Sequence, residues 1–121
     1  MDNSNNKKEH FVRVPEEIYG AALAYEFNKT QLKAVLYIIR KTFGYKNKAD
    51  GDFISISKMA KDTGLSRVGM SRAIADLEKL HVIDTVRSKQ SKTSLIFMQV
   101  NHPKHWDVPI SVPEKWWEHV K

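Results

Sequence analysis

Three features of the sequence predict a single small α+β domain that is mainly helical. The chain of 121 residues, 41% of them hydrophobic, can bury one core but has no room for a second full domain. Apolar residues recur at helical spacing through several stretches between residues 15 and 80. Two segments rich in β-branched residues follow, separated by a polar stretch, which is the pattern of a β-hairpin.

The charge distribution favours a polyanionic partner. The chain has 20 Lys and Arg against 14 Asp and Glu, a net charge of +6. Fourteen basic and six acidic residues lie between residues 28 and 92, so the centre carries +8 and the flanks carry −2. This pattern favours one localised surface for nucleic acid, although lysines scattered in solvent would give the same count.

Several classes of protein are excluded by what the sequence lacks. Without cysteine there is no disulfide framework, no cysteine zinc site and no cysteine nucleophile. No apolar run reaches the roughly 18 residues needed to cross a bilayer, and residues 1–10 lack the apolar stretch of a signal peptide. No Gly-rich phosphate loop or catalytic Ser/His/Asp spacing stands out. We therefore expect a soluble, cytoplasmic protein that is not an enzyme and needs no cofactor.

The N-terminal part is predicted to be an arm followed by a helix. Residues 1–10 are polar and offer nothing to bury, so they should form a disordered arm. Residues 11–14 are a candidate short strand. Pro15 suits the first turn of a helix that runs to about Tyr25, and the two glutamates after it are favourable at the positive end of the helix dipole. The residues of this helix expected to point inward are Ile18, Ala22, Leu23 and Tyr25.

The second predicted helix has the clearest start and stop signals. Asn28 and Gln31 have the spacing of a capping box, in which the two residues exchange side chain–backbone hydrogen bonds. Gly44 is placed to end the helix. The apolar residues that repeat at helical spacing between these signals are Leu32, Val35, Leu36, Ile39 and Phe43.

The middle of the chain is predicted to hold a loop, a strand and a short helix. Residues 45–51 combine lysines with an Asp-Gly turn pair, which indicates a mobile loop. Residues 53–56 are a candidate strand. Ser57 can then cap a short helix over residues 58–63.

The last third is predicted to be a hairpin and an extension. Residues 82–87 and 94–100 are the two strands, and residues 88–93 are their polar tip. Residues 102–121, which carry three prolines and three tryptophans, form a C-terminal extension with one short helix at residues 114–119.

The order of small, turn and capping residues indicates a helix-turn-helix. Ala60 is small enough to let two helices approach, Gly64 suits a turn with positive φ, and Ser66 caps a longer helix from Arg67 to about Leu80. Apolar residues would hold the second helix on the first: Met70, Ala73, Ile74, Leu77 and Leu80. With the hairpin added, the layout predicts a winged helix-turn-helix with a β-hairpin wing over residues 11–101.

The exposed face of the longer helix is the candidate DNA-binding surface. In DNA-binding proteins of this fold the N-terminal part of the second helix enters the major groove. Arginine can bind guanine bidentately, serine is adaptable, and Val68 can contact a thymine methyl group. Ser66 and the helix N-terminus can hold a phosphate. The residues predicted to bind DNA are Ser66, Arg67, Val68, Ser71, Arg72 and Lys79, with Arg87, Lys89 and Lys92 on the wing and Lys46 and Lys48 in the loop.

The C-terminal segment leaves two further questions. His102 and His105 could begin a metal site, but only Asp107 or His119 could complete it, so no metal is expected. Trp106 and the two later tryptophans either pack back on the domain or dock a second subunit.

Five short segments also carry a family resemblance: residues 11–15 (FVRVP), 39–45 (IRKTFGY), 54–57 (ISIS), 63–67 (TGLSR) and 70–74 (MSRAI). The second is the most distinctive, whereas GLSR occurs in many winged-helix regulators. Through them the chain resembles the N-terminal, origin-binding domain of bacteriophage replication protein O. The resemblance implies a winged helix that binds repeated origin sequences as a homodimer. It also implies that a helicase or helicase loader is a partner if the full protein has a separate C-terminal part.

The sequence thus predicts sequence-specific binding of double-stranded DNA at a replication origin, to initiate phage-type DNA replication. Two alternatives remain: a winged-helix transcriptional regulator and a winged-helix protein-interaction module. Clustered binding repeats beside replication genes would indicate an initiator, whereas one palindrome over a promoter would indicate a regulator. Loss of all affinity for duplex DNA at low salt would indicate an interaction module.

Overall fold

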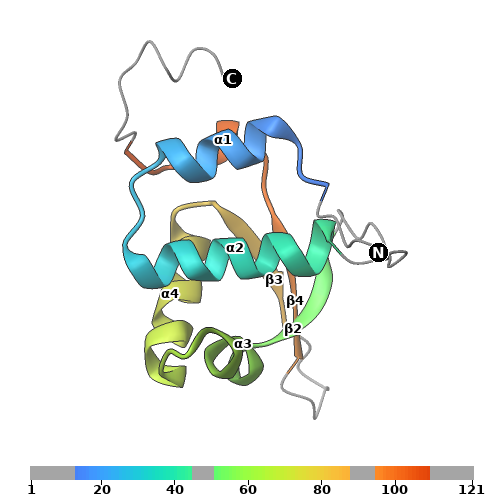
Figure 1. Cartoon of the computed structure of the whole chain (residues 1–121), viewed down its shortest axis with the longest axis vertical. Coiled ribbons are helices and arrows are strands. Elements are labelled where there is room, and N and C mark those ends of the chain that lie inside the picture. Colours follow the sequence, from blue (N-terminus) through green and yellow to red (C-terminus); the bar gives the residue numbers. More distant parts are fainter. Residues whose placement is uncertain (1–12, 45–50, 88–94, 110–121) are drawn as a thin grey trace, which may run out of the picture.

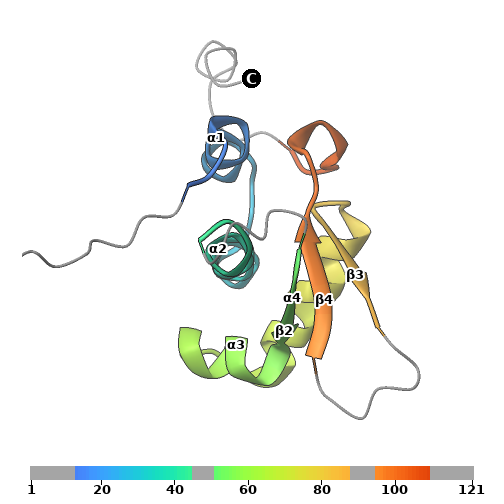
Figure 2. The ribbon, with the colours of Figure 1, turned by 90° about the vertical axis from the view of Figure 1, so that its right-hand side faces the viewer.

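The computed structural model describes residues 13–44, 51–87 and 95–109. Within these residues there are four α-helices, three antiparallel strands and one short 3₁₀ helix. Two views at right angles show α1 above α2, the sheet along one side of α2, and α3 at the opposite end of the molecule from α1 (Figure 1, Figure 2). The predicted mainly helical α+β class is confirmed.

Helix α1 (Glu16–Ala24) starts directly after Pro15, with both glutamates in its first turn. Small residues form its buried face, since Ala21 and Ala24 are fully buried. The prediction that Leu23 points inward is wrong, because it lies on the opposite face and is 54% exposed. Arg13 and Val14 are not in a strand, and the rest of the predicted strand at 11–14 lies outside the described residues.

Helix α2 (Lys29–Phe43) begins with the predicted capping box. The Gln31 amide donates to Asn28 Oδ1 over 2.8 Å, and the Asn28 amide donates to Gln31 Oε1 over 3.1 Å. The buried stripe of this helix runs through Ala34, Val35, Ile38, Ile39 and Thr42, which leaves Leu36 exposed against expectation. Gly44 ends the helix in the right-handed region with φ −86°, so glycine is not required there by its backbone angle.

Strand β2 (Asp52–Ser55) runs directly into helix α3 (Ile56–Thr63). The predicted cap at Ser57 is wrong. Ser55 is the cap instead, and its Oγ accepts a hydrogen bond from the Lys58 amide over 3.2 Å. The helix starts earlier than predicted because Ile56, which had the apolar character of a strand residue, is buried as part of the helix.

The predicted hairpin forms from β3 (Ile83–Val86) and β4 (Leu95–Val100). Strand β2 pairs with the other edge of β4, giving an antiparallel sheet in the order β2-β4-β3. The inner face of the sheet buries Ile54, Ile83 and Met98 against the helices. The layout is that of the predicted winged helix-turn-helix.

The described start of the C-terminal extension packs on the domain. After the 3₁₀ helix η1 (Pro103–His105), Trp106 is buried in the main core with 6% of its surface exposed. Its ring meets Tyr25 edge to face at 5.2 Å between centroids, and its Nε1 donates to the Asn101 carbonyl over 2.8 Å. For this tryptophan, the structure supports packing on its own domain.

Several predicted elements lie outside the described residues: the arm at 1–10, most of the loop at 45–51, the wing tip at 88–93 and the helix at 114–119. Among the helices that are described, none is both long and apolar enough to span a membrane.

Candidate nucleic-acid interface

The turn between α3 and α4 has the geometry that the sequence predicts. Gly64 ends α3 in the left-handed region with φ 72°, where residues with a side chain are disfavoured. The Leu65 amide then donates to the Ala60 carbonyl over 3.0 Å, and the Leu65 side chain packs on the core. Ala60 is 4% exposed, so its small side chain lies in the contact between the two helices.

Helix α4 (Arg67–Lys79) has one buried and one exposed face. Met70, Ile74 and Leu77 are fully buried beneath it. The residues of this helix that are predicted to bind DNA are all exposed: Arg67, Val68, Ser71, Arg72 and Lys79. Ala75 is exposed on the same face. Val68 is the most open apolar side chain among them, at 70% exposure. The helix therefore offers a continuous outer surface of cationic, hydroxyl and small apolar groups.

The N-terminus of α4 is capped as predicted, because Ser66 Oγ accepts from the Gly69 amide over 2.9 Å. Helix geometry leaves the amides of the first residues without carbonyl acceptors inside the helix. The helix dipole favours an anion at this end of α4.

Arg67 is held in place by a residue that the sequence analysis assigned to another role. Its Nε donates to Ser57 Oγ on α3 over 2.8 Å, and both residues are exposed. Because the bond uses Nε, the two terminal nitrogens of the guanidinium keep their donors for another acceptor. Ser57 and Arg67 are ten residues apart, and this spacing gives no sequence signal, because their contact depends on the angle between α3 and α4.

The other predicted cations occupy different positions. Lys79 stands in the last turn of α4, about 18 Å along the helix axis from Arg67. Arg87 follows β3 and forms an exposed ion pair with Glu78 over 3.3 Å, while Glu78 also accepts from Thr85. A phosphate at Arg87 would have to compete with that carboxylate. The four lysines predicted at positions 46, 48, 89 and 92 lie outside the described residues.

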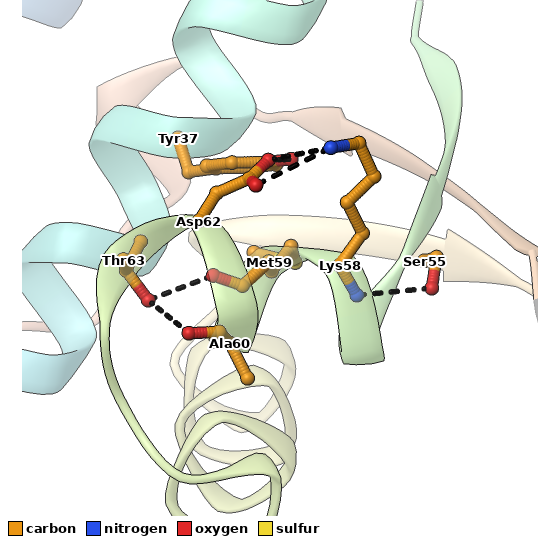
Figure 3. Close-up of polar contacts among 7 residues, drawn as sticks. All are labelled: Tyr37, Ser55, Lys58, Met59, Ala60, Asp62 and Thr63. Carbon is orange, nitrogen blue, oxygen red and sulfur yellow. Dashed lines mark hydrogen bonds and ion pairs between the residues drawn. The ribbon is translucent and has the colours of Figure 1, made fainter.

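A polar cluster that the sequence analysis missed joins α2 to α3 (Figure 3). Tyr37 Oη donates to Asp62 Oδ2 over 2.8 Å, and Lys58 Nζ lies 3.1 Å from the same oxygen. These bonds, first that from Tyr37 and then that from Lys58, lower the pKa of the Asp62 carboxyl. The Lys58–Asp62 spacing of four residues is a signal for the ion pair, but nothing in the sequence marks Tyr37 as its partner.

The histidine pair considered for metal binding has other contacts. His102 Nε2 lies 3.2 Å from Glu17 Oε2, and its Nδ1 accepts from the Lys104 amide over 3.1 Å. Within the part of the chain that the structure describes, no three potential metal ligands come together.

Fold and surface together define the chain as a winged helix-turn-helix protein, with a capped second helix whose outer face is exposed. The family model of bacteriophage replication protein O matches residues 3–98, and the chain belongs to that family. Membership places the protein in phage DNA replication. Comparison with curated proteins and with solved structures gives no match.

Proposed function

We propose that this domain binds double-stranded DNA sequence-specifically at a replication origin, as a non-enzymatic initiator of phage DNA replication. The observation that carries the proposal is the outer face of α4. Arg67, Ser71 and Arg72 are exposed near its capped N-terminus, while the opposite face is locked into the core. In DNA-binding helix-turn-helix proteins, residues near the N-terminus of the second helix contact base edges in the major groove.

Two groups of side chains would have different roles on the DNA. Arg67 and Arg72 present forked donors that match the O6 and N7 acceptors of guanine, and Val68 presents methyl groups to thymine. Lys79, Arg87 and the lysines at 46, 48, 89 and 92 would contact phosphates, which position the protein without reading sequence. Ser66 and the amides at the start of α4 would hold one more phosphate.

Rigid packing supports reading by α4. Arg67 is oriented by Ser57, so less side-chain entropy is lost when it binds a base. Helix α3 is in turn fixed on α2 by the Tyr37–Asp62 bond. Helix α4 is thus bonded to α3, and α3 is bonded to α2, so the orientation of α4 is fixed. A helix of fixed orientation can present its side chains in one register to successive base pairs.

The proposal includes partners and a compartment. Two copies would bind paired half-sites about one helical turn, ~34 Å, apart. A helicase or helicase loader is a partner if the full protein carries a separate C-terminal part. The work would take place in the cytoplasm of the infected cell, where the replicating DNA lies.

Selection of bound sequences from random duplexes tests the proposal. We expect one enriched motif, with affinity at least about 1,000-fold above that for a scrambled duplex. Lys104→Ala is the matched control, because this exposed cation on η1 lies at the end of the molecule opposite α3. Equal affinity for all duplexes would overturn sequence-specific binding. No affinity at low salt would favour a protein-interaction module, and a single palindrome at a promoter would favour a regulator.

A further inference from the structure

One hydrogen bond at the surface joins the two helices of the helix-turn-helix. Arg67 is the first residue of α4, Ser57 is the second residue of α3, and Arg67 Nε donates to Ser57 Oγ over 2.8 Å. Both residues are exposed, so the bond competes with water and contributes little to the stability of the fold. Its main effect is therefore on the direction of the Arg67 side chain.

The acceptor of this bond is held by the backbone around it. Ile56 before Ser57 is 6% exposed, and Met59 after it is fully buried, so the first turn of α3 is anchored in the core. Ser55, and not Ser57, caps the helix by accepting from the Lys58 amide (Figure 3). The Ser57 hydroxyl is thus not needed for the helix start, and it accepts from Arg67 at a fixed place.

The atom that Ser57 binds decides which donors of Arg67 are left. A guanidinium has one N–H on Nε and two on each terminal nitrogen. It can bind a pair of acceptors side-on, with Nε and one terminal nitrogen, or end-on, with both terminal nitrogens. Because Nε already donates to Ser57, only the end-on contact is open to Arg67.

An end-on fork of fixed direction suits one base. Guanine presents two adjacent acceptors, O6 and N7, in the major groove. Adenine presents an acceptor beside a donor, so one N–H of the fork would face another N–H. Cytosine offers a donor, and thymine offers a single acceptor. An arginine that cannot turn its side edge to the DNA is therefore expected to select guanine.

Arg72 provides a contrast on the same face of α4. It is exposed like Arg67, but within the part of the chain that the structure describes its guanidinium has no hydrogen bond to another residue. Arg72 therefore keeps all five donors and the freedom to turn. The two arginines differ in preorganisation, although the sequence gives them the same chemistry.

We propose that Ser57 is a specificity-determining positioning residue, which holds Arg67 Nε so that the two terminal nitrogens read one guanine end-on. The inference rests on the proposed binding of duplex DNA by α4. It adds α3 to the reading of sequence through a side chain that need not touch the DNA. The selected site should then contain a G·C pair whose preference depends on both Ser57 and Arg67.

The test uses the duplex selected with the wild-type protein. The pair read by Arg67 is the one whose preference is lost in Arg67→Ala, and a second duplex carries A·T at that pair. Ser57→Ala should reduce the ratio of the two affinities by about 3- to 10-fold, the gain expected from one immobilised side chain. The preference at the pair read by Arg72 should not change. Fluorescence anisotropy with labelled duplexes measures both ratios.

Three variants show whether Ser57 acts through Arg67. Ser57→Thr keeps the hydroxyl and should restore the wild-type ratio. Arg67→Lys keeps the charge but has neither Nε nor a fork, so adding Ser57→Ala to it should have no further effect. Thr30→Ala is the matched control, because it removes a hydroxyl from the same second position of α2. Ser57→Ala should fold normally, since alanine favours a helix and the cap at Ser55 is kept.

Three results would overturn the inference while leaving duplex binding intact. The first is a preferred site whose affinity ratio is unchanged by Ser57→Ala. The second is an equal loss of affinity for selected and scrambled duplexes, which would make Ser57 a phosphate contact. The third is the same change of ratio in the Arg67→Lys background, which would show an effect not carried by Arg67. Wild-type protein without any preferred sequence would instead overturn the proposed function, and this inference with it.

Discussion

The outer face of α4 and the outer face of the sheet both expose side chains, yet the two surfaces differ in almost every chemical respect. The face of α4 carries arginines and hydroxyl groups on a helix whose other side is fully buried. On the outer face of the sheet, Phe53, Phe97 and Val86 pair in register across three strands, and Leu95 lies two residues before Phe97 on the same face. The first surface can form directional hydrogen bonds, and the second can only exclude water and stack.

This difference teaches that one small domain can carry two exposed surfaces that suit different ligands. Base edges in a duplex present donors and acceptors, which the polar face of α4 can match. Both surfaces are built on one core, because Ile74 below α4 and Met98 below the sheet belong to the same buried cluster.

The largest effect should come from removing a side chain on which both surfaces depend. Trp106→Ala deletes a buried ring that packs on Tyr25 and Phe27, and should lower the free energy of unfolding by ~3–5 kcal/mol. Urea unfolding measures this change, and binding of duplex DNA should fall with it. A loss below ~1 kcal/mol would show that residues 102–109 are dispensable to the core.

The next largest effect should come from salt, which acts on the charged face of α4 and not on the apolar face of the sheet. If α4 and the wing neutralise ~4–6 phosphates, log affinity for the duplex should fall against log salt with a slope of about −4 to −5 per subunit. Between 50 and 200 mM salt that slope amounts to about 250- to 1,000-fold. A flat duplex slope would contradict electrostatic binding altogether.

Within the duplex-binding surface, base contacts and phosphate contacts should be separable. Arg72→Ala should cost ~1–3 kcal/mol on the specific site and relax the preference at one base pair. Lys89→Ala should weaken specific and scrambled duplexes nearly equally and reduce the salt slope by about one unit. Affinities of both variants for both duplexes at several salt concentrations provide the measurement.

Neither substitution should change stability much, because Arg72 is exposed and Lys89 is predicted to lie outside the core. Lys104→Ala again serves as the control for loss of one positive charge. If Arg72→Ala lowered both affinities equally while Lys89→Ala altered base preference, the roles of α4 and the wing would be reversed.

The smallest effect concerns the polar cluster that fixes α3. The hydrogen bonds from Tyr37 and Lys58 lower the pKa of Asp62, so they stabilise the folded state above the ordinary carboxyl pKa. That contribution should be lost as the pH falls below about 4 and through the lowered pKa. Asp62→Asn should therefore be slightly less stable at neutral pH and lose less stability on acidification. Identical pH profiles of unfolding would contradict the assignment.

Local signals made much of this fold predictable. The capping box of Asn28 and Gln31, the cap at Ser66 and the turn at Gly64 each need only residues close in sequence, and all three were predicted correctly. The buried and the exposed face of α4 were also predicted correctly, from the helical spacing of its apolar residues.

What the sequence did not reveal depends on contacts between distant elements. The exposure of Leu23 and Leu36 was mispredicted because periodicity does not say which neighbour covers a helix face. The bond between Ser57 and Arg67 arises only when α3 and α4 cross, so it leaves no signal in the sequence. The sequence therefore suggests only the capping role for Ser57. The contact between Phe53 and Phe97 requires the pairing of β2 with β4 across more than 40 residues, which no turn signal specifies.

The two described glycines with positive φ, Gly64 and Gly51, differ in how readily another residue could replace them. At Gly64 no atom lies within 4 Å of the position that a Cβ would take, so only the backbone angle opposes substitution. Asparagine and aspartate tolerate that angle, and a lineage can exchange them for glycine at small cost. At Gly51 the Phe97 ring and the Met98 carbonyl occupy the space as well. A side chain at Gly51 would need both the Phe97 ring and the backbone at Met98 to shift, and φ +125° would oppose it as well, so glycine is required there on two separate grounds.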